Sequence, residues 1–372
     1  MSQRENVNPR REQDHRKNSR RYQKRAAARR RRNTIFIVEI VLLLILAVVL
    51  FFMSKLSKIE KTKLDMDKIE VNEDISQESQ KIMKGYQTIA MFGLDNRSNG
   101  NLSQGRSDVI MLANINNDTK EVKLVSVYRD TYLDTGDGIF QKCNAAYAKG
   151  GPEQAISMLN VNLDLNITDY VTVDFNSIIE CVDLLGGVDM EITDDEASLM
   201  TGYIRELNEL TGNKAENLTQ GGTYTLNGVQ ACAYARIRYG GGDDYRRTER
   251  QRTVLTAMVK KAQQSDLTTV NKLINEVCGD IQTSFSNAEL LALASQVFQY
   301  SIGDTTGFPF TKTTKVLSKK TGDVVIPCDL SDNVKELHIF LYEDSAYTVS
   351  DTVKQNSEKI VSDTGFKSGD GH

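Results

Sequence analysis

Six arginines are crowded into the stretch AYARIRYGGGDDYRRTERQR, residues 233–252. Arginine binds phosphate well because its guanidinium group offers several N–H donors in one plane and keeps its charge. A cluster of this kind can bind a phosphorylated ligand or nucleic acid. It can also form surface ion pairs, here with Asp243, Asp244 and Glu249. The spacing of the arginines gives the first indication of which chemistry applies.

The spacing predicts that four of the six converge, and these four are Arg236, Arg238, Arg247 and Arg250. The first two lie two residues apart in 232–239, which alternates as a strand does, so they share a face. The last two lie three residues apart in the first turn of a helix predicted over about 247–263, so they also share a face. With a helix N-terminus nearby, this corner is predicted to bind the phosphates of an ester. Arg246 and Arg252 fall off the shared face and are expected to be surface charges.

Two aspartates are predicted to lie at adjacent strand ends, because Asp95 closes one predicted strand and Asp108 opens the next. Two such carboxylates can share a hard divalent cation, Mg²⁺ or Mn²⁺, with water and phosphate oxygens completing its shell. Arg97 and Arg106 lie between them in the sequence and could instead neutralise both carboxylates without a metal. The spacing leaves both interpretations open.

Arg129 and Asp130 end a third predicted strand, 122–130. Ligand sites in α/β proteins gather at strand ends, which makes this pair a candidate for the reaction centre. The alternative is an ion pair that braces the turn.

Strands and helices alternate between about 85 and 363, which predicts one mixed α/β domain. The predicted strands are 87–95, 108–116, 122–130, 169–175, 188–192, 232–239 and 324–330. The predicted helices are 150–160, 176–187 with Asn176 as the N-cap, about 247–263, 266–278, 287–300 and 331–342. Residues 194–220 are predicted to form a loop with some helix.

The N-terminus is basic and then apolar. Residues 1–33 hold 13 Lys and Arg against 3 Asp and Glu, which leaves 33 against 47 in the rest of the chain. A nucleic-acid-binding domain is normally basic, so this body does not suit one. The run TIFIVEIVLLLILAVVLFFM, residues 34–53, is long enough to span a bilayer as a helix. A core helix would not be apolar on every face, and no small-x-small site suggests a cleaved signal peptide.

The five cysteines show no metal-binding spacing, and the three histidines are scattered. Cys143, Cys181 and Cys232 lie in apolar segments and are expected to be small buried side chains. Cys278 and Cys328 are the one pair considered for a disulfide.

Seven stretches from about 85 to 300, with a weaker trace to about 363, resemble in content and order the LytR–CpsA–Psr family of membrane-anchored cell-wall enzymes. They are FGLDNRSNG, GRSDVIML, VSVYRDTYLD, KCNAAYAKGG, DYVTVDFNSIIECVDLLGGVDMEI, LNGVQACAYARIRY and RRTERQRTVL. Two departures are Tyr128, where the family usually has proline, and a slightly long GGGDDY segment before Arg247.

The resemblance implies a phosphotransferase that moves a glycopolymer phosphate from an undecaprenyl-pyrophosphate carrier to a peptidoglycan hydroxyl. The polymer would be wall teichoic acid, capsule or a similar one. The implied fold is an α/β/α sandwich around a central, mostly mixed sheet, with an apolar tunnel for the polyprenyl chain. Carried over by position, Asp95 and Asp108 would hold Mg²⁺ (or Mn²⁺), and Arg106, Arg129 and Asp130 would take part in catalysis. The base for the incoming hydroxyl would be Asp130 or an aspartate near the arginine cluster. The pyrophosphate would be held by Arg236, Arg238, Arg247, Arg250 and Gln251.

The implied partners are the lipid-linked glycopolymer, peptidoglycan and membrane lipid, with no nucleic acid. The expected parts are a basic cytoplasmic tail (1–33), a transmembrane helix (34–53), an extracytoplasmic stem (54–84), the catalytic domain (85–363) and a disordered C-terminus (364–372). The positive-inside rule places the catalytic domain outside the cell membrane. Three alternatives stay open: a pyrophosphatase that uses water as acceptor, a transcriptional attenuator that contacts DNA through its tail, and a non-catalytic polymer-binding scaffold.

Overall fold

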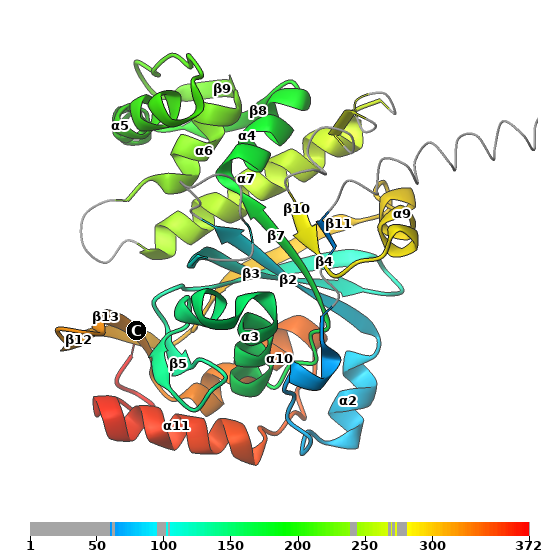
Figure 1. Ribbon diagram of the computed structural model, residues 1–372, viewed down its shortest axis with the longest axis vertical. Helices are drawn as coiled ribbons and strands as arrows, with labels where there is room; N and C mark the ends of the chain where they lie inside the picture. Colours follow the sequence, from blue (N-terminus) through cyan, green and yellow to red (C-terminus); the bar gives the residue numbers. More distant parts are fainter. Residues whose placement is uncertain are drawn as a thin grey trace, which may run out of the picture. The chain divides into compact units, whose positions relative to one another are not determined.

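Figure 1 shows a computed structural model of the 372-residue chain. The structure describes residues 60–61, 64–94, 102, 105–238, 244–266, 269, 272–273 and 281–371. No helix within these ranges is long and apolar enough to cross a membrane. The apolar run 34–53 lies outside the described residues, so the transmembrane helix stays a prediction.

A central sheet organises the described part of the chain, in which it has seven strands. In hydrogen-bonded order they are β1 (Glu60–Lys61), β10 (Ile281–Thr283), β7 (Asp169–Asp174), β2 (Tyr86–Leu94), β3 (Ser107–Asn116), β4 (Glu121–Val127) and β11 (Ser301–Phe308). Strand β2 is antiparallel to β3 and parallel to β7, so the sheet is mixed. The predicted mixed α/β fold is therefore confirmed.

Helices cover both faces of this sheet, as Figure 1 shows. They are α3 (Ala145–Leu163), α10 (Leu330–Tyr342) and α11 (Asp351–Thr364) on one face, and α7 (Asp244–Gln264) and α9 (Asn287–Ser295) on the other. Successive side chains of a strand point to opposite faces. Ala90 and Phe92 of β2 accordingly join the first core, whereas Ile89 and Met91 pack in the second. The result is the expected three-layered arrangement.

A second helical group packs on α7 around a core of its own, at the top of Figure 1. Its members are α4 (Phe175–Leu184), β8 (Val188–Ile192), α5 (Asp194–Thr211), β9 (Gly222–Leu226) and α6 (Gly228–Arg236). The strands β8 and β9 form an antiparallel pair separate from the central sheet. The remaining described elements are η1 (Met66–Lys68), α2 (Gln77–Met83), β5 (Tyr132–Asp134), β6 (Phe140–Lys142), β12 (Lys312–Ser318) and β13 (Gly322–Pro327).

The strand predicted over 232–239 is wrong, because most of this segment belongs to helix α6. A capping box fixes its start: the Gln230 amide donates to Asn227 Oδ1 at 3.0 Å, and the Asn227 amide donates to Gln230 Oε1 at 3.1 Å. Arg236 ends the helix, and Ile237 turns to extended geometry. Arg236 and Arg238 therefore do not share a strand face.

Helix α6 approaches α4 unusually closely at its first residue, Gly228. A Cβ atom at this position would lie 2.1 Å from the carbonyl oxygen of Ile179. The Gly228 amide also donates to Asp183 Oδ1 at 2.7 Å. Only glycine allows the two helices to meet at this distance.

Two further helices differ from the prediction. The segment 194–220, predicted to be mainly loop, contains α5, which begins at a Thr193–Glu196 capping box and ends at Gly212 with a φ of 73°. Helix α4 is capped by Asp174, whose side chain accepts from the Ser177 amide, rather than by Asn176. In both cases a capping side chain, Thr193 or Asp174, marks where the helix begins.

Helix α3 begins at Ala145, five residues before its predicted start. Its backbone leaves the helical region at Gly150 and Gly151, and Pro152 opens the second part. The prediction found only this second part. The helix predicted over 266–278 lies largely outside the described residues.

Residues 64–84, expected to belong to a stem, pack on the domain, because Ile69, Ile75 and Met83 are part of its main core. Cys143 and Cys232 are buried, as predicted, while Cys181 is half-buried. Cys328 is a free thiol, so the disulfide considered for it is absent.

Candidate functional site

A polar cavity of about 280 Å³ opens between the central sheet and the second helical group. Its charged lining comes from four elements far apart in the sequence: the start of β3, the end of β4, the end of α6 and the first turns of α7. The lining residues are Asp108, Val109, Arg129, Phe175, Tyr203, Arg236, Arg238, Arg247 and Gln251. Four of these are arginines: Arg236, Arg238 and Arg247 of the predicted corner, joined by Arg129.

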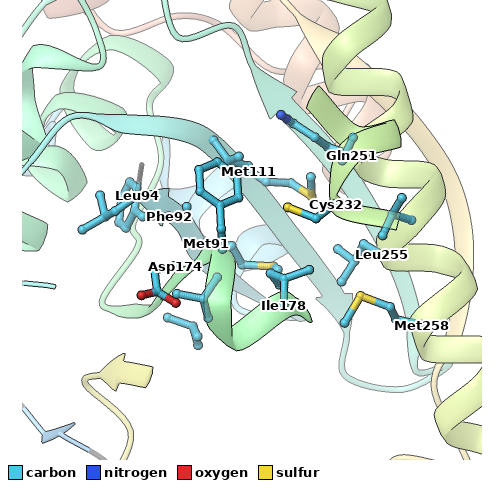
Figure 2. Close-up of a pocket in the computed structure, with 17 residues that line it drawn as sticks. Met91, Phe92, Leu94, Met111, Asp174, Ile178, Cys232, Gln251, Leu255 and Met258 are labelled. Carbon is cyan, nitrogen blue, oxygen red and sulfur yellow. The ribbon is translucent and has the colours of Figure 1, made fainter. Parts of the chain in front are cut away.

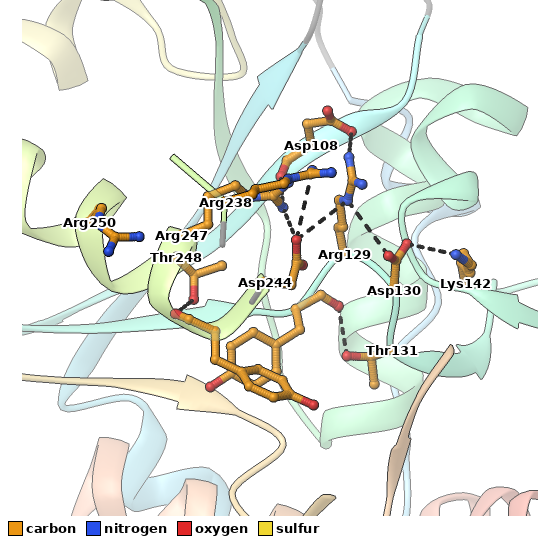
Figure 3. A network of polar contacts seen from close by, with 12 residues as sticks. Asp108, Arg129, Asp130, Thr131, Lys142, Arg238, Asp244, Arg247, Thr248 and Arg250 are labelled. Carbon is orange, nitrogen blue, oxygen red and sulfur yellow. Dashed lines mark hydrogen bonds and ion pairs between the residues drawn. The ribbon is translucent and has the colours of Figure 1, made fainter. Parts of the chain in front are cut away.

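Asp244, the first residue of α7, is the acidic centre of the arginine cluster (Figure 3). Its Oδ1 lies 2.8 Å from Arg247 Nη2, 3.9 Å from Arg238 Nη2 and 3.9 Å from Arg129 Nε. Its Oδ2 has no hydrogen-bond partner among the described residues. The sequence indicated Asp244 as a surface partner for arginine, and the base was expected to be Asp130 or an unspecified aspartate near the arginines. The signal that could have found it is its position three residues before Arg247 at a helix start.

Burial raises the pKa of Asp244 to about 6. The positive charge of Arg129 works against this rise, while the negative charge of Asp130 adds to it. A carboxyl group with a pKa near neutrality can exchange a proton at physiological pH, which suits a general acid or base.

Arg129 also contacts two further carboxylates, those of Asp108 and Asp130. Its Nη1 lies 2.8 Å from Asp108 Oδ1, and its Nε lies 3.8 Å from Asp130 Oδ2. Asp130 is also bound by Lys142, whose Nζ lies 3.2 Å from Oδ1. Burial acts to lower the pKa of Arg129, but the surrounding carboxylates, Asp108 first among them, leave that pKa raised. Arg129 is therefore a permanent cation held by three acidic residues.

Arg236 enters the cavity from the end of α6. Its Nη2 lies 3.2 Å from Glu206 Oε1, and its guanidinium carbon lies 5.2 Å from the ring centre of Phe175 and 5.6 Å from that of Tyr203. Aromatic faces attract a guanidinium group and hold it in one orientation. The ring pair thus positions Arg236 although the predicted strand is absent.

Arg250 does not reach this cavity. Its Nε lies 3.0 Å from Glu196 Oε1 of α5, and its Nη1 donates to the carbonyl oxygen of Ile237 at 3.5 Å. It lines another cavity together with Glu196, Tyr234 and other polar residues. The predicted convergence of Arg247 and Arg250 is thus not found: the first binds Asp244 and the second binds α5.

Gln251 lies on α7 one turn after Arg247, and its Oε1 has no hydrogen-bond partner among the described residues. Arg106 is exposed just before β3 and is not among the residues that line the polar cavity. Asp95 lies outside the described residues. Leu94 of β2 is paired with Ser107 of β3, so the strand ends that precede Asp95 and Asp108 are adjacent, as predicted.

An apolar cavity of about 130 Å³ adjoins the polar one (Figure 2). It lies between the sheet and helices α4, α6 and α7, and side chains such as Met111, Ile178 and Met258 line it. Val109, Phe175 and Gln251 line both cavities. The polar and the apolar cavity therefore share a wall. This arrangement suits an amphiphile with an anionic head and an apolar tail.

Comparisons with known proteins show which proteins this chain is similar to. The sequence model of the LytR_cpsA_psr family matches residues 46–315. The transferase TagU of Enterococcus faecalis is 30% identical over 210 residues, which cover 56% of this chain and 64% of TagU. TagV of Bacillus subtilis is 30% identical over 195 residues, which cover 51% and 48%. Both are named polyisoprenyl-teichoic acid–peptidoglycan teichoic acid transferases. The matched part thus spans about half to two thirds of these relatives.

Solved structures share the fold. Crystalline B. subtilis TagV is 25% identical with a TM-score of 0.55, over 72% of this chain and 99% of that one. TagT bound to LI-WTA is 22% identical with a TM-score of 0.57, over 75% and 99%. TagT with bound octaprenyl pyrophosphate lipid is 22% identical with a TM-score of 0.51, over 70% and 92%.

Proposed function

The chain belongs to the LytR–CpsA–Psr family, and on this premise we propose that it transfers a glycopolymer phosphate from a polyprenyl-pyrophosphate carrier to a hydroxyl group of peptidoglycan. One observation carries the proposal: the arginine-lined cavity shares a wall with the apolar cavity. A polyprenyl pyrophosphate likewise has an anionic pyrophosphate joined directly to an apolar chain. The names of TagU and TagV, and the prenyl pyrophosphate bound by TagT, support this choice of donor.

The arginines would neutralise the donor's charge. Attack at a pyrophosphate phosphorus concentrates negative charge on the attacked and the leaving phosphate, and fixed cations at both lower the barrier. Arg238 and Arg247 already face Asp244, and Arg129 faces Asp108. We propose that phosphate oxygens of the donor join or replace these carboxylates as partners. Arg236 would contact the donor from the opposite wall, while Arg250 would brace α5 against α7.

A divalent cation, Mg²⁺ or Mn²⁺, would be held by Asp95 and Asp108. The donor set fits a hard cation, because carboxylate oxygens are its preferred ligands and Asp108 faces the cavity. When bound, the cation would supply further neutralisation of the pyrophosphate charge. Arg129 would then have the additional task of orienting the Asp108 carboxylate, to which it is bound at 2.8 Å.

Asp244 is the proposed general base, ahead of Asp130. Both oxygens of Asp130 are paired, one with Arg129 and one with Lys142. Asp244 Oδ2, in contrast, has no hydrogen-bond partner among the described residues, and burial raises the pKa of Asp244 to about 6. In the proposed step, the acceptor hydroxyl oxygen forms a bond to the phosphorus nearer the glycopolymer. Its proton passes to Asp244, and the phosphoanhydride bond breaks so that the polyprenyl phosphate leaves.

The location of this chemistry follows from the same proposal. A lipid-linked donor stays in the membrane, so an enzyme that uses it gains from being anchored there. We propose that residues 34–53 span the membrane, with the basic tail in the cytoplasm and the domain outside.

The test is a transfer assay with the full-length chain, a polyprenyl-pyrophosphate-linked saccharide and polymer-free peptidoglycan. A phosphodiester-linked saccharide on the peptidoglycan is the expected product, and Arg129→Ala is the control that should lose it. Release of saccharide phosphate into water, with none on the peptidoglycan, would identify a pyrophosphatase instead. Binding of the lipid-linked saccharide without any product would indicate a non-catalytic scaffold.

A further inference from the structure

A second groove, of about 660 Å³, runs along the other side of α7 from the polar cavity. Its walls are the exposed face of β8 and the edge strand β11. Along α7 it extends from Arg252 to Gln264, which is about 18 Å of helix axis at the usual rise. The groove is therefore long enough for an extended chain rather than a single small molecule.

Arg252 closes one end of this groove and is the observation that points to a ligand. The residue is 8% exposed, although the sequence predicted a surface charge. Its Nε and Nη1 have no hydrogen-bond partner among the described residues. A buried guanidinium group with unused donors is costly unless a ligand satisfies them. Burial lowers the pKa of Arg252, yet an arginine stays charged at physiological pH.

The rest of the groove carries charges of both signs. Lys260 and Lys261 lie on α7, and Asp189 and Glu191 face them from β8. Lys261 Nζ lies 3.4 Å from Asp189 Oδ2. A chain of repeated phosphates would meet Arg252 favourably but would be repelled by the two acidic residues. A chain with both carboxylates and an amine would be attracted at each point.

We propose that this groove binds the acceptor, a glycan whose peptide branches carry carboxylates and an amine, with one carboxylate on Arg252. This inference rests on the proposed function, which supplies peptidoglycan as the acceptor. Arg252 directly follows Gln251, a lining residue of the polar cavity, so the two sites are separated by the width of one helix. A peptide held in the groove would leave its sugar near the start of α7, about 12 Å away along the helix axis, where Asp244 lies.

The test uses the full-length chain and a soluble disaccharide-peptide cut from polymer-free peptidoglycan. Arg252→Gln and Lys260→Glu should each weaken its binding, measured by calorimetry, by about tenfold or more, because each loses a charged partner. Binding of octaprenyl pyrophosphate should stay within about twofold of the unchanged protein in both variants, because neither substitution removes a group that lines the two cavities proposed for the lipid. Lys260 is exposed, so its variant reports on binding even if Arg252→Gln folds poorly. Lys335→Glu, on α10 across the sheet, is the matched control and should bind like the unchanged protein.

Undiminished disaccharide-peptide binding by both variants would overturn the inference. So would a loss of affinity for a soluble polyol-phosphate polymer alone, because the groove would then hold the donor's polymer. The proposed function fails separately: in that case the unchanged protein would not bind octaprenyl pyrophosphate at all. If both variants retain lipid binding and bind the disaccharide-peptide normally, the groove does not bind the acceptor, while the proposed transferase function stands.

Discussion

Arg247 and Arg250 lie three residues apart on α7, yet their guanidinium groups bind carboxylates on different sides of the helix. Arg247 Nη2 is 2.8 Å from Asp244 in the polar cavity, and Arg250 Nε is 3.0 Å from Glu196 of α5. Adjacent arginines of one motif therefore have separable tasks. One is placed to hold a ligand, and the other holds two helices together.

Replacing these two arginines should produce different defects. Arg247→Ala should lower the transfer rate by at least about a hundredfold, as the loss of one charge-stabilising donor does elsewhere. It should destabilise the fold less than Arg250→Ala does, because Asp244 keeps Arg129 and Arg238 at 3.9 Å. Arg250→Ala should instead lower the free energy of unfolding by about 3 kcal/mol, because it leaves the half-buried carboxylate of Glu196 without its cation. Denaturant titration and the transfer assay measure the two effects. If the Arg250→Ala variant is stable but fails to bind lipid pyrophosphate, Arg250 contributes to the ligand site after all.

The pH dependence of transfer should reflect Asp244. Its pKa is raised to about 6 in the folded protein, so the carboxylate needed as a base forms as the pH rises through that value. We expect kcat/KM to increase with pH and to level off above about 6, and Asp244→Asn to remove this rise together with most of the activity. A profile that Asp244→Asn merely scales down, with the same midpoint, would assign the titration to another group.

Titration of Asp244 should affect stability in the opposite direction: the free energy of unfolding should fall as the pH rises. A carboxyl whose pKa is higher in the folded state than in the unfolded chain stabilises the fold when it is protonated. Its contribution is complete below the unfolded value of 3.8 and is lost as the pH rises to about 6. Asp244→Asn should therefore be less sensitive than the unchanged protein to a pH rise from about 4 to about 7, in chemical unfolding at matched ionic strength. Identical slopes would contradict the raised pKa.

Removal of divalent cations with a chelator should abolish transfer, and Mg²⁺ or Mn²⁺ should restore it. Asp108→Asn should need at least about tenfold more Mg²⁺ for half-maximal rate, since even outer-shell changes at metal sites cost this much. Titration of Mg²⁺ at saturating donor checks this. Full activity in excess chelator would favour the alternative in which arginines alone neutralise the aspartates.

The apolar cavity should set the affinity for the lipid part of the donor. Ala235→Phe would fill space on α6 that lines this cavity, and overpacking of this kind costs about 1–3 kcal/mol. We expect octaprenyl pyrophosphate to bind at least about tenfold more weakly, while inorganic pyrophosphate binds as before. Equal losses for both ligands would show that the substitution disturbs Arg236 at the end of the same helix rather than the lipid site.

The sequence predicted the parts of the fold in which local pattern and tertiary environment agree. The strands around Phe92 and Leu112 alternate between two buried faces, and the helix from Leu330 begins at a clear capping residue, Asp329. The prediction for the segment with Arg236 was wrong, because a short apolar run with alternating arginines fits both the strand period and the helix period. The capping box at Asn227 was the signal that would have decided for helix.

The site was harder to predict than the fold, because its geometry depends on contacts between distant segments. The residue types were found, and Arg129, Arg236, Arg238, Arg247 and Gln251 do line one cavity with Asp108. The separation of Arg250 was not predictable, because Glu196 lies 54 residues away and comes from a helix taken to be loop. Arg252 was taken for a surface charge because spacing on one helix does not reveal which neighbouring strand covers it.

The contact between Gly228 and Ile179 has a consequence for the position of Arg236. Helix α6 is a rigid rod of nine residues, about 12 Å long, with Gly228 at one end and Arg236 at the other. Any side chain at Gly228 would push the rod away from α4 and carry the arginine with it. A position with no charge and no lining contact with either cavity thus fixes where Arg236 lies, and its substitution should reduce activity by the same route as loss of the arginine.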